Sequence, residues 1–223
     1  MKLAELLEKT EYTVVSGNVD VEVKELQYDS RKVTRGDVFV CISGAVVDGH
    51  DFITDVIAKG AAAVIVERDT QGIETADAVI IRTPDTRLAL AYMSAAFFDY
   101  PAEKLFTIGI TGTKGKTTTT FMVRDILEAC NIKTGLIGTI ETIIGDTHIP
   151  SANTTPESYM VQKYFRDMAD AGCRCVVMEV SSQALMLHRT AGIMFDIGVF
   201  TNLEPDHIGP NEHSSFEEYA ACK

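Results

Sequence analysis

The sequence has no long apolar run, few basic residues and no cysteines at C-x-x-C spacing. No stretch approaches the ~20 apolar residues of a membrane-spanning helix. The first ten residues, MKLAELLEKT, carry acidic side chains and no apolar core, so we expect neither a secretory signal nor membrane insertion. Lys and Arg number 20 against 32 Asp and Glu, giving a net charge of −12. This excess of acid argues against a nucleic-acid partner, because phosphate backbones are bound through clustered Lys and Arg.

The five cysteines form an odd set, which is typical of reduced, buried thiols in a cytoplasmic protein. Cys173 and Cys175 could act as metal ligands, but the run CRCVVMEV favours the start of a buried strand. With 46% hydrophobic and 23% charged residues, the composition is that of an ordinary globular protein. A length of 223 residues allows one large or two small domains.

Short strands and helices alternate along the chain, which predicts an α/β fold with a mostly parallel sheet. Pro101, in FDYPAEK, suggests a boundary between domains 1–100 and 101–223. Leu3, Leu6 and Leu7 suggest a short amphipathic helix, and Ser215 with Glu218 resembles a helix-capping box. In the first part we expect strands near 20–28, 37–42, 61–67 and 78–82, a helix near 51–59 and a helix opening at Pro84 with Leu88, Ala91, Tyr92 and Ala95 on one face. In the second part we expect strands at 104–110, 135–140, 174–180 and 195–201, helices near 116–130 and 156–170, and a hairpin over 141–150.

Residues 110 to 121, ITGTKGKTTTTF, place two glycines, a lysine and four threonines after an apolar lead-in. The common phosphate loop has four residues between its first glycine and Gly-Lys-[Ser/Thr], whereas only two separate Gly112 from Gly115. The physical requirements are nonetheless met by backbone N–H groups, Lys116 and the hydroxyl of Thr117 at a helix N-terminus. The alternative is a flexible Gly/Thr loop, but the order of strand, loop and helix favours phosphate binding.

Polar residues also follow the ends of several expected strands. Lys116, Glu179 and His207 each come after such a strand, and ligands of open α/β sheets sit beyond the carboxyl ends of the strands. We therefore expect the three to converge on one edge. Glu179 is either a second magnesium ligand or a structural carboxylate that caps the next helix. His207 is either a metal ligand or a solvated loop histidine.

Taken together, these segments resemble the Mur ligase family and, within it, the UDP-N-acetylmuramyl-tripeptide synthetases. TGTKGKTTTT is similar to that family's shortened phosphate loop, and DSRKVTRGDVFVCISGAVVDGHDF is similar to its amino-terminal uridine-nucleotide domain. NTTPE resembles the central substrate motif, and MEVSSQAL and FTNLEPDH resemble the metal-binding segments. The resemblance spans nearly the whole chain.

The resemblance implies an ATP- and Mg²⁺-dependent amide ligase of peptidoglycan precursor synthesis. The γ-phosphate would pass to the D-glutamate carboxylate of UDP-N-acetylmuramoyl-L-alanyl-D-glutamate, and the amine of lysine or meso-diaminopimelate would attack the acyl phosphate. It also implies a small α/β uridine-nucleotide domain followed by a P-loop domain. In the family the central domain continues beyond Lys223 and a third domain follows, so we expect a truncated, inactive fragment, cytoplasmic and monomeric.

The same resemblance implies residue roles. Lys116, Glu179, His207 and Lys223 would be catalytic, and Thr117, Glu179, His207 and a carbamylated Lys223 would hold magnesium. Lys114 stands where many relatives have Asn, so we expect an extra, tolerated cation near the phosphates. The nucleotide phosphates would be bound by Gly112, Thr113, Lys114, Gly115, Lys116, Thr117 and Thr118. The uridine nucleotide of the substrate would be bound by Tyr28, Ser30, Ala45, Val46 and Val47, where Tyr28 stands at a position at which some relatives have another contacting residue. The sugar-peptide part of the substrate would be bound by Asn153, Thr154, Thr155, Ser181 and Arg189.

Two other interpretations stay open at this point. The chain could be a truncated, non-catalytic module that binds uridine nucleotide or ATP. It could also be another enzyme with a short phosphate loop, such as a small-molecule kinase or a folylpolyglutamate-type ligase. The DSRK and GDVFV motifs argue against the latter, since those enzymes have no evident use for them.

Overall fold

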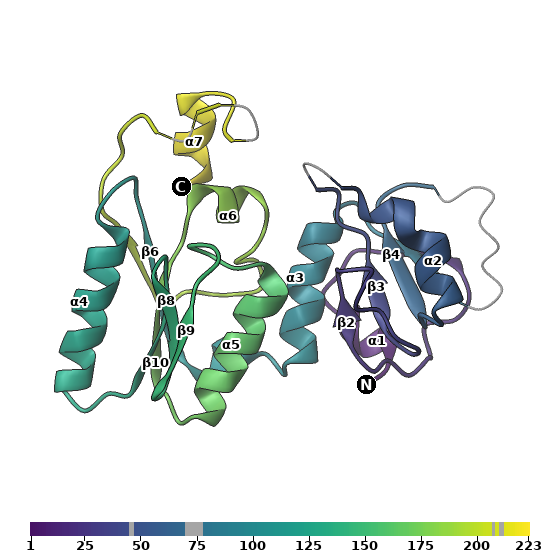
Figure 1. Cartoon of the computed structure of the whole chain (residues 1–223), viewed down its shortest axis with the longest axis horizontal. Helices are drawn as coiled ribbons and strands as arrows, with labels where there is room; N and C mark the ends of the chain where they lie inside the picture. Colours follow the sequence, from purple (N-terminus) through teal and green to yellow (C-terminus); the bar gives the residue numbers. More distant parts are fainter. Residues whose placement is uncertain (45–46, 70–77, 207, 210–211) are drawn as a thin grey trace. The chain divides into compact units, whose positions relative to one another are not determined.

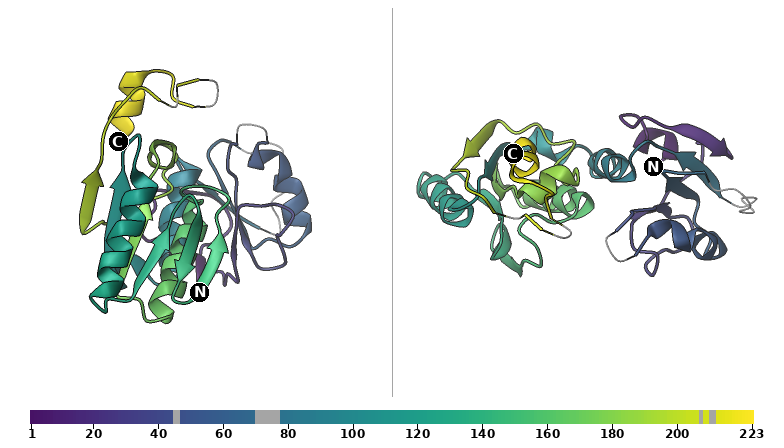
Figure 2. Two further views of the ribbon diagram at one scale, coloured as in Figure 1. Left: turned by 60° about the vertical axis from the view of Figure 1, so that its left-hand side comes forward. Right: turned by 90° about the horizontal axis from the view of Figure 1, so that it is seen from above.

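The protein is described from a computed structural model that covers residues 1–44, 47–69, 78–206, 208–209 and 212–223 (Figures 1 and 2). The chain divides into two compact units, Met1–Phe97 and Phe98–Lys223. Among the described residues, no helix is long and apolar enough to cross a membrane.

Unit 1 is built on a five-stranded sheet with the order β1-β5-β4-β3-β2. All neighbouring strands are parallel except β1 and β5, which pair antiparallel. Its elements are α1 (Leu3–Leu6), β1 (Thr13–Ser16), β2 (Leu26–Gln27), β3 (Val38–Val40), the 3₁₀ helix η1 (Gly49–Phe52), α2 (Ile53–Ala58), β4 (Ala63–Val66), β5 (Val79–Arg82) and α3 (Thr86–Phe97).

The central strands of unit 1 are buried on both faces. Every residue of β3 and β4 is buried, as expected for parallel strands that helices cover. Phe39, Val64 and Val66 pack with Ile53 and Val56 of α2 in one apolar cluster. The sequence of unit 1 therefore reads as short continuous apolar runs rather than an alternating pattern.

Unit 2 holds a six-stranded sheet with the order β11-β6-β10-β7-β8-β9. The first four strands run parallel, and β8 and β9 form an antiparallel hairpin at one edge. Its elements are the 3₁₀ helix η2 (Pro101–Lys104), β6 (Phe106–Thr111), α4 (Lys116–Ala129), β7 (Thr134–Ile137), β8 (Glu141–Ile144), β9 (Thr147–Pro150), α5 (Ser158–Asp170), β10 (Cys175–Glu179), α6 (Ser182–Met186), β11 (Ile197–Phe200) and α7 (Phe216–Cys222).

Helices α4 and α5 cover opposite faces of this sheet (Figure 1). Val176 and Met178 of β10 pack in the cluster that contains Phe165 of α5. Cys175 and Val177 pack with residues of α4 in a separate cluster. Because side chains alternate along a strand, these two sets point to opposite faces of the sheet. Since β6, β7, β10 and β11 run parallel, their carboxyl ends lie at the same edge.

The fold class expected from the sequence is confirmed, while several local expectations are wrong. Only Leu26–Gln27 of the expected strand 20–28 pairs in the sheet, and β1 and α6 were not expected. The expected apolar face of the helix after Pro84 is only partly right: Ala91 and Ala95 are buried, but Leu88 and Tyr92 are only partly so. Other buried residues of this helix lie outside the expected face: Ala89, Leu90, Met93 and Ser94. A helix buried over most of its surface carries no single apolar stripe.

The cysteines also differ in part from the expected buried thiols. All five are free, and Cys41, Cys173 and Cys175 are buried. Cys130 is exposed, because it follows the last residue of α4 at the surface. Burial raises the pKa of Cys175 to about 11, so this thiol stays protonated near neutral pH.

Candidate functional site

The loop expected to bind phosphate, called the phosphate loop below, links β6 to α4 through residues 112–115. Gly112 and Gly115 have φ angles of +139° and +83°, which glycine adopts at little cost. Lys116 is the first residue of α4, and its Nζ donates to the carbonyls of Gly112 (2.8 Å) and Thr113 (3.0 Å). A lysine folded back over a glycine loop at a helix N-terminus is the arrangement that binds phosphate oxygens.

The loop is fastened to the segment that follows β11. The backbone N–H of Thr113 donates to the carbonyl of Asn202 (3.0 Å), and that of Lys114 donates to the Asn202 side chain (2.9 Å). Lys114 also forms an ion pair with Glu204, which raises the pKa of this exposed lysine. The cation expected beside the phosphates is thus paired with a carboxylate, a partner that the sequence did not indicate.

Glu179, the last residue of β10, is fully buried. Its carboxylate accepts from the hydroxyl of Thr117 (2.9 Å) and from the backbone N–H (2.8 Å) and hydroxyl (3.1 Å) of Thr139. Gly138 leaves room for it, since a Cβ there would lie 2.4 Å from Glu179 Oε1. The carboxylate and hydroxyl oxygens are hard donors of the kind Mg²⁺ prefers, so the residues fit that ion.

The magnesium set expected from the sequence is only partly described. His207 lies outside the described residues, and within the described part of the chain no three His, Cys, Asp or Glu side chains form a cluster fit for a metal. Nζ of Lys223 donates to the carbonyl of Gly112 (2.9 Å) and to the hydroxyl of Thr111 (3.2 Å), beside the loop. Thr117 and Glu179 are the two expected ligands that the structure brings into contact.

Two lysines beside the loop have lowered pKa values. Partial burial lowers the pKa of Lys116, and Glu179 opposes this shift. Partial burial, together with the nearby Lys116 ammonium, lowers the pKa of Lys223 to about 8. Nζ of Lys223 also lies 5.0 Å from the ring centroid of Tyr219. At a given pH, a larger fraction of Lys223 is therefore the neutral amine than for an ordinary lysine.

A polar pocket of about 170 Å³ opens beside Lys116. Its walls contain all five residues of unit 2 that were expected to bind the sugar-peptide substrate: Asn153, Thr154, Thr155, Ser181 and Arg189. The same walls contain Ser182, Gln183, Glu212 and His213, which the sequence did not single out. Residues from four separate parts of the sequence, near positions 116, 153–155, 181–189 and 212–213, thus line one pocket.

Hydrogen bonds set the positions of the pocket residues. The hydroxyl of Thr155 donates to the carbonyl of Glu179 (2.8 Å) and accepts from the N–H of Ser181 (3.1 Å). Arg189 donates from Nη1 to the carbonyl of Thr155 (3.1 Å), and its Nε lies 3.6 Å from the Glu157 carboxylate. This Nε is buried and makes no hydrogen bond within the described part of the chain, so the nearby Glu157 carboxylate is its charge partner.

Helix α7 adds residues to this edge. Tyr219 is fully buried, and its hydroxyl shares a hydrogen bond with that of Thr113 (2.8 Å). His213, also buried, pairs through Nε2 with the Ser182 hydroxyl (2.9 Å) and stacks edgewise on Tyr219. Ser215 caps the helix by accepting from the N–H of Glu218, as expected. Of these features only the cap at Ser215 was expected from the sequence, because Tyr219 and His213 belong to no motif that we used.

Unit 1 has a cavity of about 500 Å³ that Tyr28, Ser30 and Val47 line with other residues. Ala45 and Val46, also expected to contact the uridine nucleotide, lie outside the described residues. Beside Ser30, a side-chain hydrogen bond from Arg31 lowers the pKa of Asp29 to about 2. Thr118, expected near the phosphates, is an exposed residue in the first turn of α4.

Two similar curated proteins are ligases of the same name. It is 48% identical over 223 residues to the UDP-N-acetylmuramoyl-L-alanyl-D-glutamate--2,6-diaminopimelate ligase of Clostridium perfringens, covering 100% of this chain and 45% of that protein. It is 44% identical over 224 residues to the ligase of the same name from Clostridium tetani, covering 100% of this chain and 46% of that protein. The chain thus spans less than half the length of these relatives.

Solved structures show the same fold. A UDP-N-acetylmuramoyl-L-alanyl-D-glutamate--2,6-diaminopimelate ligase superposes with a TM-score of 0.79 at 24% identity, covering 100% of this chain and 44% of that one. The MurF ligase of Thermotoga maritima in complex with ADP gives a TM-score of 0.52 at 23% identity, covering 90% and 42%.

Two family models match successive parts of the sequence. The model for the catalytic domain of the Mur ligase family matches residues 22–98. The model for the Mur ligase middle domain matches residues 110–223, which is more than half of the chain. With both matches in the order of the two units, the chain belongs to the Mur ligase family.

Proposed function

We propose that this chain is the substrate-binding and ATP-binding part of an amide ligase of peptidoglycan precursor synthesis. The ligase would join a diamino acid to UDP-N-acetylmuramoyl-L-alanyl-D-glutamate. One observation carries the proposal: Lys116 of the phosphate loop shares a pocket wall with Thr155, Ser181 and Arg189. A group held in that pocket would lie next to the bound phosphates.

The phosphate loop would bind ATP. Bound ATP would supply the phosphoryl group that activates a carboxylate. Backbone N–H groups at the N-terminus of α4 and the ammonium of Lys116 would hold the phosphates. Thr117 and Glu179 would hold Mg²⁺, together with His207 and a carbamylated Lys223, because their oxygen and imidazole donors suit a divalent cation.

The pocket would hold the peptide end of the second substrate. Arg189 lines this pocket, and a guanidinium suits a carboxylate. Asn153, Thr154 and Ser181 add polar side chains that can bind amide groups. In unit 1, the cavity beside Tyr28, Ser30 and Val47 would hold the uridine nucleotide.

The relatives are more than twice as long as this chain, which supports the proposal that these 223 residues hold only part of the enzyme. The 223 residues alone would bind both nucleotides without completing the reaction, as a non-catalytic module would. The same proposal includes a cytoplasmic location and a monomeric state. It also includes diaminopimelate as the amine that is added, which the names of the relatives support.

The proposal is tested by measuring ADP release from a full-length protein that contains this chain. The enzyme receives ATP, Mg²⁺ and UDP-N-acetylmuramoyl-L-alanyl-D-glutamate, with meso-diaminopimelate or lysine in separate assays. We expect release to be stimulated by diaminopimelate and abolished by Lys116→Ala. Stimulation by lysine alone would correct the amine, and stimulation by neither would overturn the ligase assignment. The 223-residue chain, assayed beside it, should bind ADP without turnover.

A further inference from the structure

Part of the cavity wall in unit 1 is formed by two short segments, 42–44 and 47–50, that lie against each other. The N–H of Gly44 donates to the carbonyl of Val47 (3.0 Å), and that of Gly49 donates to the carbonyl of Ile42 (2.9 Å). Gly44, Val47 and Gly49 line the cavity. A Cβ on Gly49 would lie 2.7 Å from the backbone nitrogen of Ile42, so the approach is close. Where these segments sit therefore sets the shape of the cavity.

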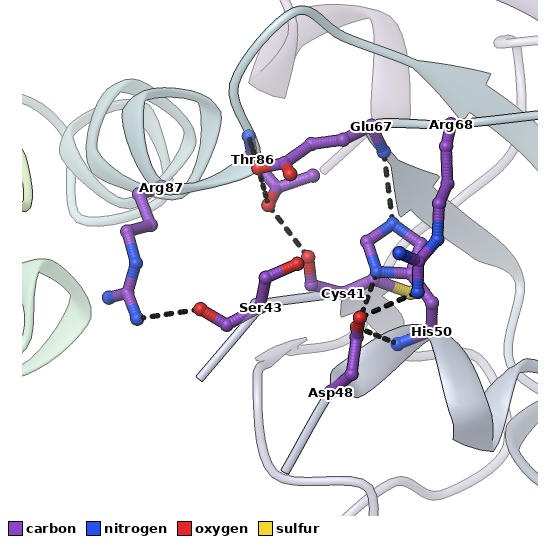
Figure 3. A network of polar contacts seen from close by, with 8 residues as sticks. All are labelled: Cys41, Ser43, Asp48, His50, Glu67, Arg68, Thr86 and Arg87. Carbon is purple, nitrogen blue, oxygen red and sulfur yellow. Dashed lines mark hydrogen bonds and ion pairs between the residues drawn. The ribbon is translucent and has the colours of Figure 1, made fainter. Parts of the chain in front are cut away.

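A buried histidine fastens the wall to the neighbouring strand. His50 Nδ1 lies 2.7 Å from Asp48 Oδ1, and Asp48 Oδ1 also accepts from the backbone N–H of His50 (2.9 Å). On the other side of the ring, Nε2 accepts from the backbone N–H of Glu67 (3.1 Å), directly after β4. Figure 3 shows the imidazole between these two partners, with Arg68 reaching the same Asp48 carboxylate.

These partners define the proton position on the ring. A backbone N–H can only donate, so Nε2 must carry a lone pair, and the carboxylate of Asp48 can only accept, so Nδ1 must carry the proton. Partial burial would raise the pKa of Asp48, but hydrogen bonds from His50 and Arg68 lower it to about 2, so it is ionised. His50 is thereby fixed as the neutral Nδ1–H tautomer.

The chain of contacts continues to the start of α3. The carboxylate of Glu67 accepts from the backbone N–H (2.8 Å) and the hydroxyl (2.6 Å) of Thr86. The Thr86 hydroxyl also lies 2.6 Å from the carbonyl of Cys41, at the end of β3 (Figure 3). The contacts close a ring that begins and ends beside the cavity wall. Two side chains in Figure 3 link the wall to the residues directly after β4: His50, whose Nε2 accepts from the N–H of Glu67, and Arg68, which donates to the carboxylate of Asp48.

We infer that His50 is a positioning residue for the nucleotide cavity, acting through the hydrogen bond that ties the wall segment 47–50 to the backbone of Glu67. The inference rests on the proposed function of this cavity. The ligand class is a uridine diphosphate group, and His50 touches the wall rather than the ligand. The bond to Asp48 lies within the wall segment itself, so of the two bonds of the imidazole only the one to Glu67 ties that segment to residues outside it.

This distinction can be tested with two amide substitutions of equal polarity. The amide of Asn overlaps Nδ1, so His50→Asn keeps a donor for Asp48 and leaves the Glu67 N–H without its acceptor. The amide of Gln reaches the place of Nε2, so His50→Gln keeps an acceptor for Glu67 and loses the bond to Asp48. Each variant removes one hydrogen bond of ordinary strength. A merely structural role would affect both variants alike.

The affinity of the 223-residue chain for uridine diphosphate is measured by calorimetry, beside its stability in urea. We expect binding by His50→Gln within about twofold of the wild type and by His50→Asn weakened about tenfold, the effect of one lost hydrogen bond at the upper end of its range. His148→Gln is the matched control, because His148 pairs with Glu141 through Nδ1 (2.8 Å) at the surface of unit 2. This control should bind as the wild type does.

Equal affinities of the two His50 variants, or affinities that follow stability alone, would overturn the inference and leave the proposed function intact. Absence of uridine diphosphate binding by the wild type would overturn the proposed function of the cavity and the inference with it. Nitrogen NMR of the wild-type imidazole gives an answer that needs no variant to fold. A proton found on Nε2 instead of Nδ1 contradicts the inference.

Discussion

Gly112 and Gly115 both have positive φ angles, but only Gly112 lacks room for a side chain. A Cβ on Gly112 would lie 2.0 Å from the hydroxyl of Thr201, whereas one on Gly115 would meet nothing within 4 Å. The Thr201 hydroxyl is itself held by the carbonyl of Lys114 (2.8 Å). Close approach of the two segments, and not φ alone, therefore requires glycine at position 112.

Gly112→Ala should destabilise the fold more than Gly115→Ala. Each variant strains a backbone with positive φ at a cost of about 1–2 kcal/mol, and Gly112→Ala adds the clash with Thr201. Urea unfolding of the two variants measures the difference. In a Thr201→Ala background the clash is gone, so the penalty of Gly112→Ala should fall towards that of Gly115→Ala. Equal penalties for the two single variants would contradict this explanation.

Lys223 and Lys114 should differ in the pH at which they react. Partial burial and the Lys116 ammonium lower the pKa of Lys223 to about 8, while the Glu204 carboxylate raises that of Lys114. The neutral amine of Lys223 should thus appear as the pH rises through about 8, and that of Lys114 only at higher pH than for an ordinary lysine. Trace labelling with an amine reagent, read by mass spectrometry, gives both profiles.

The midpoint of each labelling profile is the relevant quantity, since burial slows the absolute rate at Lys223. A neutral amine is also the form that adds CO₂, so bicarbonate near pH 8 should protect Lys223 from the reagent and leave Lys114 unaffected. Coincident profiles for the two lysines would show that the environment of Lys223 does not lower its pKa.

At the scale of elements, the sequence predicted helices and strands best where a single segment contains the whole pattern that identifies them. The unit β6, loop and α4 was expected within two residues at either end, because an apolar run, glycines and a helical pattern follow one another. β1 was missed, since Thr13–Ser16 is mostly exposed and pairs only with β5. α6 was missed because five residues are too few for a periodic pattern.

The residues of the candidate site were also predicted only where a local sequence motif contains them. Asn153, Thr154, Thr155, Ser181 and Arg189 were identified through motifs and lie around one pocket. Thr139, His213 and Tyr219 were not, although each contacts a residue of that edge. Their contacts join positions 31 to 106 residues apart in the chain. Such partners are set by tertiary packing, which local patterns do not encode.

Helix α7 should stabilise the phosphate loop through Tyr219. Tyr219→Phe keeps the buried ring and removes the hydroxyl bonded to Thr113, at a cost of about 1 kcal/mol. We expect a severalfold loss of ADP affinity, because Thr113 also holds the loop to the backbone of Glu204. Calorimetry with ADP measures it, and Tyr12→Phe, an exposed site in unit 1, is the control. Unchanged affinity would mean that α7 does not support the loop.

At the scale of the whole molecule, each unit has a sheet, covering helices and an apolar cluster of its own. The division at Phe97 and Phe98 lies three residues before the boundary at residue 100 that the sequence suggested. The described walls of the pocket beside Lys116 lie entirely in unit 2, and those of the cavity beside Ser30 lie entirely in unit 1. The two cavities therefore have their walls in separate parts of the chain.

Separate expression of residues 1–97 and 98–223 should preserve the two binding activities. Residues 1–97 should bind uridine diphosphate and not ADP, because the described wall of the uridine cavity lies in unit 1. Residues 98–223 should bind ADP and not uridine diphosphate, because Gly115 and Lys116 of the phosphate loop lie in unit 2. Calorimetry measures both ligands against both units, with circular dichroism to confirm that each is folded. Lys116→Ala should abolish ADP binding by 98–223, and His50→Asn should weaken only 1–97. A folded unit that loses its ligand would show that its site needs residues of the other.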